Sequence, residues 1–157
     1  MSIEVGQQAP DFTLFNTKLE KISLKELRTK SNVVMLFFPL AFTNVCKTEL
    51  CSTRDEISIY ENLNATVLGI SVDSPFCLAK FREENELPFD LLSDFNKDVA
   101  KQYDSLCDDE RLGFKGLTKR SAFVIDKQGQ IKYAEILENA DKLPDFDQIK
   151  QTLENCN

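Results

Sequence analysis

The feature that most constrains the fold is an uninterrupted apolar run, VVMLFF, at residues 33–38. Successive side chains of a β-strand point to opposite faces of a sheet, so a strand of this composition is buried on both faces. Such a strand lies inside a sheet that helices cover on each side, which is the arrangement of α/β proteins. The run therefore predicts a central strand of an α/β domain.

The rest of the chain alternates between strand-like and helix-like segments. A polar turn at residues 16–18 separates two short strands and predicts an N-terminal hairpin. Ser74 followed by Pro75 is typical of a helix start, and the glycine-containing turn at residues 126–130 predicts a second hairpin. The expected strands are residues 12–14, 19–23, 33–38, 66–72, 89–92, 121–125 and 131–137, and the expected helices are residues 49–63, 74–86, 97–103 and 144–154.

These segments predict an α/β fold with a central mixed β-sheet, flanking helices and an N-terminal β-hairpin extension. We expect the sheet to be parallel in its centre and antiparallel at an edge, as in the thioredoxin fold. No internal repeat, low-complexity segment or flexible linker divides the 157 residues, so the prediction is a single domain over residues 1–157.

Charge and hydropathy exclude several function classes. With a net charge of −7 and no separate block of Lys and Arg, the chain lacks a phosphate-binding surface, so we expect no nucleic-acid partner. The most apolar stretch, residues 33–42, has about half of the roughly 20 residues that span a bilayer, so we expect no membrane insertion. The N-terminus shows no basic segment followed by an apolar one, which predicts a cytoplasmic location.

The chain has five cysteines and no histidine, which narrows its chemistry. In a reducing cytosol we expect the cysteines to be mostly free thiols. The absence of histidine excludes Ser-His-Asp and Cys-His catalysis and the usual mixed zinc sites, and we expect neither a metal nor another cofactor. Any activated cysteine must therefore owe its activation to other groups.

Cys46 lies where the predicted buried strand gives way, through a loop containing Pro39, to the start of a helix. The unpaired N–H groups and the positive dipole end at a helix N-terminus favour an anion and lower the pKa of cysteines placed there. The hydroxyl of Thr43 can donate a hydrogen bond to a thiolate or to a substrate oxygen. Singly, each residue is also explained as a structural thiol, a strand stop or a turn residue. Together they predict a small polar pocket, with apolar walls from Phe38, Leu40 and Phe42.

The segment from Pro39 to Cys46, PLAFTNVC, resembles the PxxxTxxC signature of the peroxiredoxins, which are thiol peroxidases of the thioredoxin fold. The resemblance covers nearly the whole chain, because GQQAPDF, GISVDSP, LPFDLLSD and RSAFVID are also similar to segments of that family. The stretch FFPLAFT is most similar to AhpE-type members. The second cysteine, Cys51, instead resembles the Q-type, bacterioferritin-comigratory branch.

The resemblance implies an enzyme that reduces hydrogen peroxide and alkyl hydroperoxides. Cys46 would be the peroxidatic nucleophile that becomes a sulfenic acid. Thr43 and the amide of Cys46 would hold the peroxide oxygens, and Pro39 would shape and shield the pocket. Arg120 would support the thiolate and the developing charge, and Glu49 would orient Arg120. From the residues alone, both of these charged side chains are also explained as solvated surface groups.

Reduction of the sulfenic acid has several candidate routes. Cys51 is the first candidate as the resolving cysteine, although within one helix it would lie about 7.5 Å along the axis from Cys46. A disulfide needs Cα atoms within about 7 Å, so the helix would have to unwind. Cys77 is the second candidate and an external thiol the third, whereas Cys156 has a less typical context and Cys107 is expected to be a bystander. The resemblance also implies a thioredoxin- or glutaredoxin-like protein or a small thiol as reductant. The AhpE-type resemblance implies a homodimer, whereas Q-type members are often monomeric.

Two other function classes stay open. A thiol-disulfide oxidoreductase of the same fold would carry a C-x-x-C motif at the helix start, whereas four residues separate Cys46 from Cys51. The other class is a non-catalytic, redox-sensing or chaperone-like protein, whose thiols only sense oxidation. Peroxide turnover that is unchanged in Cys46→Ser would favour this class.

Overall fold

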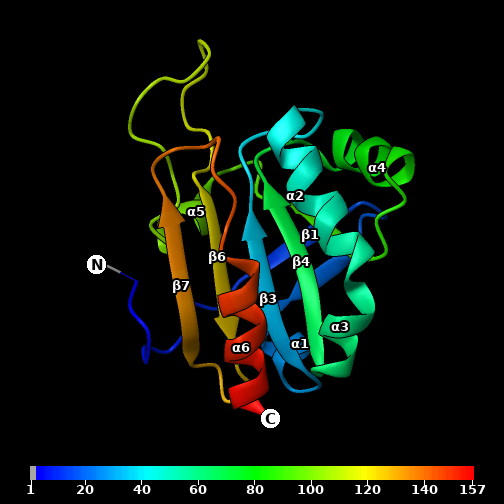
Figure 1. The fold of residues 1–157 in the computed structure, drawn as a ribbon. Coiled ribbons are helices and arrows are strands. Elements are labelled where there is room, and N and C mark those ends of the chain that lie inside the picture. Colours follow the sequence, from blue (N-terminus) through cyan, green and yellow to red (C-terminus); the bar gives the residue numbers. More distant parts are fainter. Residues whose placement is uncertain (1–2) are drawn as a thin grey trace.

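Seven strands form one mixed sheet, in the order β2-β1-β5-β4-β3-β6-β7, in the computed structural model, which describes residues 3–157 (Figure 1). The central strands are parallel, and antiparallel strands continue the sheet at both edges rather than at one. The predicted mixed sheet and N-terminal hairpin are confirmed. The strands are β1 (Thr13–Asn16), β2 (Lys21–Ser23), β3 (Asn32–Phe37), β4 (Ala65–Ser71), β5 (Asp90–Ser93), β6 (Arg120–Ile125) and β7 (Ile131–Leu137).

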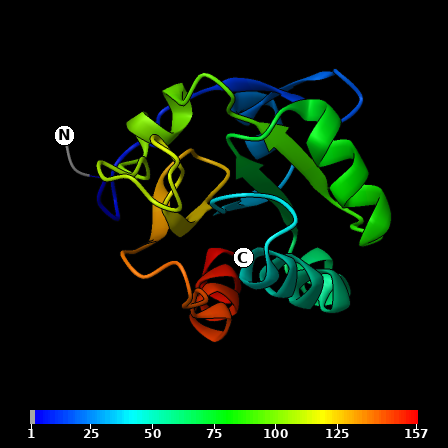
Figure 2. The same ribbon diagram turned by 90° about the horizontal axis from the view of Figure 1, so that it is seen from above.

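Helices cover both faces of this sheet. Figure 2 shows the C-terminal helix α6, in red, and the cyan helix α2 on one side of the sheet, with α5 on the other. The first face carries α2 (Asn44–Asp55), α3 (Ile57–Asn62), α4 (Pro75–Glu84) and α6 (Phe146–Cys156), and the second carries α1 (Leu24–Arg28) and α5 (Asp98–Gln102).

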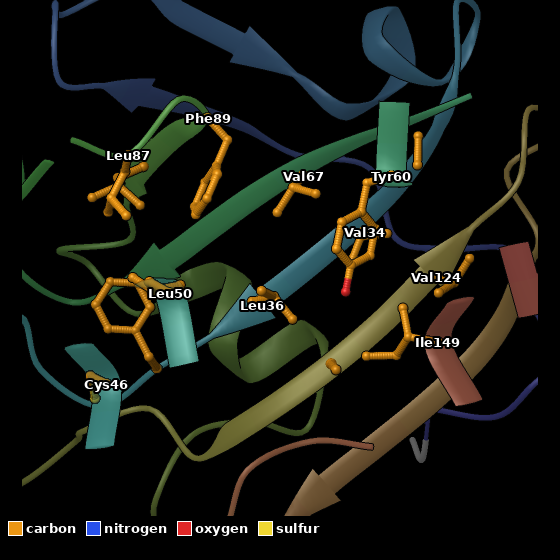
Figure 3. Close-up of a cluster of buried hydrophobic side chains, with 14 of the residues drawn as sticks. Val34, Leu36, Cys46, Leu50, Tyr60, Val67, Leu87, Phe89, Val124 and Ile149 are labelled. Carbon is orange, nitrogen blue, oxygen red and sulfur yellow. The ribbon is translucent and has the colours of Figure 1, made fainter. Parts of the chain in front are cut away.

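The apolar run of the central strand contributes to two separate cores. Val34, Leu36 and Phe38 pack into the core beneath α2, α4 and α6, whereas the alternate side chains pack into the core beneath α1 and α5. The prediction of a strand buried on both faces is therefore confirmed. Figure 3 shows the first core, where Cys46 lies at one end beside Leu50 of the same helix.

The prediction of one helix over residues 49–63 is wrong in two respects. Helix α2 begins five residues earlier, at Asn44, because Thr43 takes an extended conformation (φ −96°, ψ 150°) and serves as its N-cap. The helix is also interrupted at Glu56 (φ −111°, ψ 16°), which leaves the helical conformation and separates α2 from α3. The short helix α1 was not predicted at all. The observed start confirms the prediction that Cys46 lies at the beginning of a helix, because Cys46 falls inside the first turn of α2.

None of the helices in residues 3–157 combines the length and hydropathy needed to traverse a bilayer. Within the same residues, no group of three or more Cys, Asp or Glu side chains is placed to bind a metal ion.

Candidate active site

Cys46 occupies the first turn of α2, directly after the loop that leaves β3. It is only 1% exposed. The side chain of the N-cap residue, Thr43, makes no capping hydrogen bond to the helix. The first N–H groups of a helix have no partner within the helix itself, so those beside Cys46 are available to a ligand.

The buried guanidinium of Arg120 joins three elements at this site. Arg120 is the first residue of β6 and is 1% exposed. Its Nη2 donates to the sulfur of Cys46 at 3.3 Å, its Nη1 donates to Glu49 Oε1 at 2.6 Å, and its Nε donates to the carbonyl of Ala140 at 2.9 Å. Arg120 is therefore a buried partner of Cys46, and Glu49 a buried partner of Arg120, rather than solvated surface charges.

Burial and the opposite charge of the partner act against each other in the pair of Arg120 and Glu49. Burial raises the pKa of the Glu49 carboxyl from 4.5 to about 7, although the charge of Arg120 and its hydrogen bond oppose that shift. Burial lowers the pKa of Arg120, but the charges of Glu49 and Cys46 outweigh it and raise the pKa above its ordinary value. The guanidinium thus stays charged, and it donates a hydrogen bond to the sulfur of Cys46.

A pocket of about 330 Å³ opens onto Cys46. Its lining includes the predicted Pro39, Thr43 and Arg120, so the structure brings these residues together around the sulfur. The hydroxyl of Thr43 donates to the carbonyl of Leu40 at 2.8 Å, which leaves the lone pairs of its oxygen free to accept a hydrogen bond. In this state Thr43 is an acceptor toward the pocket rather than the predicted donor.

The predicted apolar walls are only partly correct. Leu40 lines the pocket as expected, but Phe38 is buried in the core. Phe42 packs against Phe81 of α4, with ring centroids 5.1 Å apart, and does not line the pocket. The walls that the sequence did not suggest are Leu112 and Leu117, which come from the long segment before β6. The carbonyl of Ala140 was also missed, because a backbone contact leaves no residue-type signal.

Asp73 is a further residue that sequence reasoning missed as part of the site. Its Oδ2 accepts a hydrogen bond from the backbone N–H of Ala41 at 2.8 Å and from Ser71 Oγ at 2.7 Å. Ala41 belongs to the loop between β3 and α2, whereas Ser71 ends β4. Asp73 therefore fastens the loop that carries Pro39 and Thr43 to the end of the neighbouring strand.

We expect Asp73→Ala to lower both the stability and the rate of Cys46 oxidation. The change leaves the amide of Ala41 without its partner, and one unpaired buried donor costs about 1–3 kcal/mol. The urea unfolding midpoint and the rate constant with hydrogen peroxide measure the two effects. Asp55→Ala is the matched control, because that carboxylate is exposed and pairs only with Arg54 at the surface. Equal rates in the two variants would contradict the role of Asp73.

None of the other cysteines lines the pocket of Cys46 or is joined to it by a disulfide. Cys51 lies further along α2 and donates to Asn85 Oδ1 at 3.6 Å. Cys77 lies in α4 and contacts Asp73 Oδ1 at 3.9 Å, and burial together with that carboxylate raises its pKa. Burial also raises the pKa values of the Cys107 and Cys156 thiols. All five cysteines are free thiols in the structure.

Comparisons with known proteins place the chain in a family. The profile of the AhpC/TSA family matches residues 5–134. The chain is 35% identical over 136 residues to alkyl hydroperoxide reductase E of Mycobacterium tuberculosis, which covers 85% of this chain and 86% of that protein. It is 36% identical over 146 residues to the chloroplastic 2-cysteine peroxiredoxin of Chattonella marina var. antiqua. This match covers 87% of this chain and 72% of that protein.

The solved structures give the same result. The crystal structure of peroxidoxin BcpB from Mycobacterium tuberculosis matches 99% of both chains, with a TM-score of 0.87 and 30% sequence identity. The predicted thioredoxin fold, the predicted family and the predicted thiol peroxidase class are thereby confirmed, and relatives of both the AhpE and the Bcp type are found. The chain belongs to the AhpC/TSA family, the family of the peroxiredoxins.

Proposed function

We propose that Cys46 is the peroxidatic cysteine of this peroxidase. Its thiolate sulfur attacks one oxygen of a hydroperoxide, an S–O bond forms and the O–O bond breaks. The sulfur is oxidised by two electrons to a sulfenic acid, and the departing alkoxide or hydroxide takes up a proton to leave as an alcohol or water. The observation that carries this proposal is the contact between Arg120 Nη2 and the sulfur of Cys46, at a helix N-terminus that opens onto a pocket.

The groups around Cys46 suit the charge that moves during this step. As the sulfur loses its negative charge, the oxygens of the peroxide gain it, and fixed donors lower the energy of that transition state. Arg120 and the first-turn N–H groups of α2 supply such donors, and the oxygen of Thr43 can accept the O–H of the bound peroxide. Pro39 lines the pocket and has no N–H that competes for the substrate.

We propose Cys51 as the resolving cysteine. Its thiol attacks the sulfur of the Cys46 sulfenic acid, an S–S bond forms, and the hydroxyl leaves with the thiol proton as water. Because both cysteines lie in α2, the first turns of the helix must unwind for them to meet. Unwinding breaks the contact between Cys51 and Asn85. Cys77 is the poorer alternative, because its raised pKa disfavours the thiolate that attacks.

Intact mass distinguishes these routes. One equivalent of hydrogen peroxide added to the reduced protein should lower the mass by about two units, through a disulfide. In Cys51→Ser we expect a gain of about sixteen units instead, because the sulfenic acid persists. Cys77→Ser is the matched control and should behave like the unaltered chain. A gain of sixteen in the unaltered chain would assign resolution to an external thiol, and a loss of two in Cys51→Ser would assign it to another cysteine.

The electrons that complete the cycle come, in this proposal, from a thioredoxin- or glutaredoxin-like dithiol protein or from a small thiol. Such a donor passes two electrons and two protons to the disulfide and is itself oxidised to a disulfide. Cys51 is partly exposed, which supports access of such a donor to the disulfide between Cys46 and Cys51. Peroxide-dependent consumption of NADPH, coupled through thioredoxin in one assay and through glutathione in another, identifies the donor.

We also propose a homodimer and a cytoplasmic location. Large apolar side chains such as Phe42 and Phe76 are exposed, and association would cover them. The five free thiols suit a reducing compartment. Light scattering tests the first proposal and cell fractionation the second.

A further inference from the structure

A loop between α5 and β6 contributes Leu112 and Leu117 to the pocket of Cys46. Figure 1 shows this segment, in yellow-green, extending beyond the end of the sheet at which α2 begins. Its tip is a tight turn closed by two hydrogen bonds between the backbones of Arg111 and Phe114, and the two central residues, Leu112 and Gly113, have φ values of 53° and 80°. A left-handed conformation is ordinary for glycine but unfavourable for leucine.

Leu112 combines this unfavourable backbone with an exposed apolar side chain. It is 83% exposed, yet it lines the pocket of Cys46. Neither backbone preference nor burial in a core accounts for a leucine at this position. Its position in the lining of the pocket is the remaining feature that explains an apolar side chain here.

Several of the side chains that line the pocket with Leu112 are apolar. Leu40, Val45 and Leu117 form its walls together with Leu112. The charged side chains that line it are Arg120, which is paired with Glu49, and Asp141, which is exposed. The carboxylate of Asp141 would repel a negatively charged substrate, and the lining offers no unpaired positive side chain that would attract it. Hydrogen peroxide, in turn, is too small and polar to make use of apolar walls.

We propose that Leu112 is a specificity-determining residue that binds the apolar group of an uncharged organic hydroperoxide. The inference rests on the proposed role of Cys46 as the peroxidatic cysteine. The reacting O–O bond lies at Cys46 and Arg120, and the organic substituent extends outward against Leu112 and Leu117. Removing one apolar contact of this kind from a substrate pocket changes discrimination by about 10-fold or somewhat more.

The test is Leu112→Asn, compared with the unaltered chain. Asparagine tolerates the left-handed conformation, so the turn is preserved while the apolar contact is lost. We expect the rate constant for cumene hydroperoxide to fall about 10-fold, and that for hydrogen peroxide to stay within about two-fold, because the small substrate makes no use of this wall. Phe114→Ser is the matched control, since Phe114 belongs to the same turn and is 54% exposed but does not line the pocket. Rapid quenching and intact mass provide the readout, because the chain has no tryptophan to report oxidation.

The outcomes separate this inference from the proposed function. An unchanged ratio of the two rate constants in Leu112→Asn overturns the role of Leu112, while the unaltered chain still reacts with both peroxides. An equal change in Phe114→Ser also overturns it, because the effect would then belong to the loop as a whole. If the unaltered chain reacts with neither peroxide, the proposed function itself fails.

Discussion

Replacing Cys46 by serine should lower the rate constant of peroxide reduction by roughly 10³-fold or more. The serine hydroxyl has nearly the size of the thiol but is not ionised at neutral pH, so Arg120 keeps a hydrogen-bonding partner while the nucleophile is lost. Stability should therefore change little. The measurement is peroxide consumption by the reduced protein, with the urea midpoint measured in parallel. Cys107→Ser is the control, because Cys107 is a buried free thiol that does not line the pocket of Cys46 and should retain activity.

This experiment also decides between the function classes that the sequence left open. A thiol-disulfide oxidoreductase would lose its disulfide reductase activity in Cys46→Ser, and the unaltered chain would turn over a disulfide substrate faster than a peroxide. A non-catalytic redox sensor would show the same slow peroxide consumption with and without Cys46. Either result would contradict the role of peroxidatic cysteine.

The sequence predicted the parts of the fold that depend on local patterns. The apolar run of β3 indicated burial on both faces, and Ser74 with Pro75 marked the start of α4, where Ser74 Oγ accepts the N–H of Cys77. The prediction that Cys46 lies at the start of a helix is confirmed, but the predicted bounds began at residue 49, because apolar spacing becomes regular only after the first turn. Helix boundaries depend on capping geometry more than on periodicity.

For the site, the sequence supplied the residues and the structure supplied their contacts. Cys46, Thr43 and Pro39 are close in the chain, so their proximity followed from the motif itself. The pairing of Arg120 with Glu49 joins residues that are 71 positions apart, and only the family resemblance suggested it. Leu112 could not be found in this way. An exposed leucine in a polar loop becomes meaningful only when the loop is seen to line the pocket.

The second large effect is expected for Arg120→Met, which should lose both activity and stability. The variant removes the donor to the sulfur of Cys46, and the loss of one such stabilising donor costs about 10²–10³-fold in rate. It also leaves Glu49 buried without its counter-charge, and breaking a buried ion pair from one side costs about 3–5 kcal/mol. A low rate in this variant alone would therefore not separate chemistry from unfolding.

The double variant Arg120→Met with Glu49→Gln separates the two effects. The glutamine removes the buried charge that the single variant leaves unpaired, so the urea midpoint should recover much of its loss. The rate constant with hydrogen peroxide should remain as low as in Arg120→Met, because the sulfur of Cys46 still lacks its guanidinium donor. If the rate constant recovered together with the stability, Arg120 would act only by pairing with the charge of Glu49. A low rate at restored stability assigns Arg120 a direct part in stabilising the thiolate and the charge that develops on the peroxide.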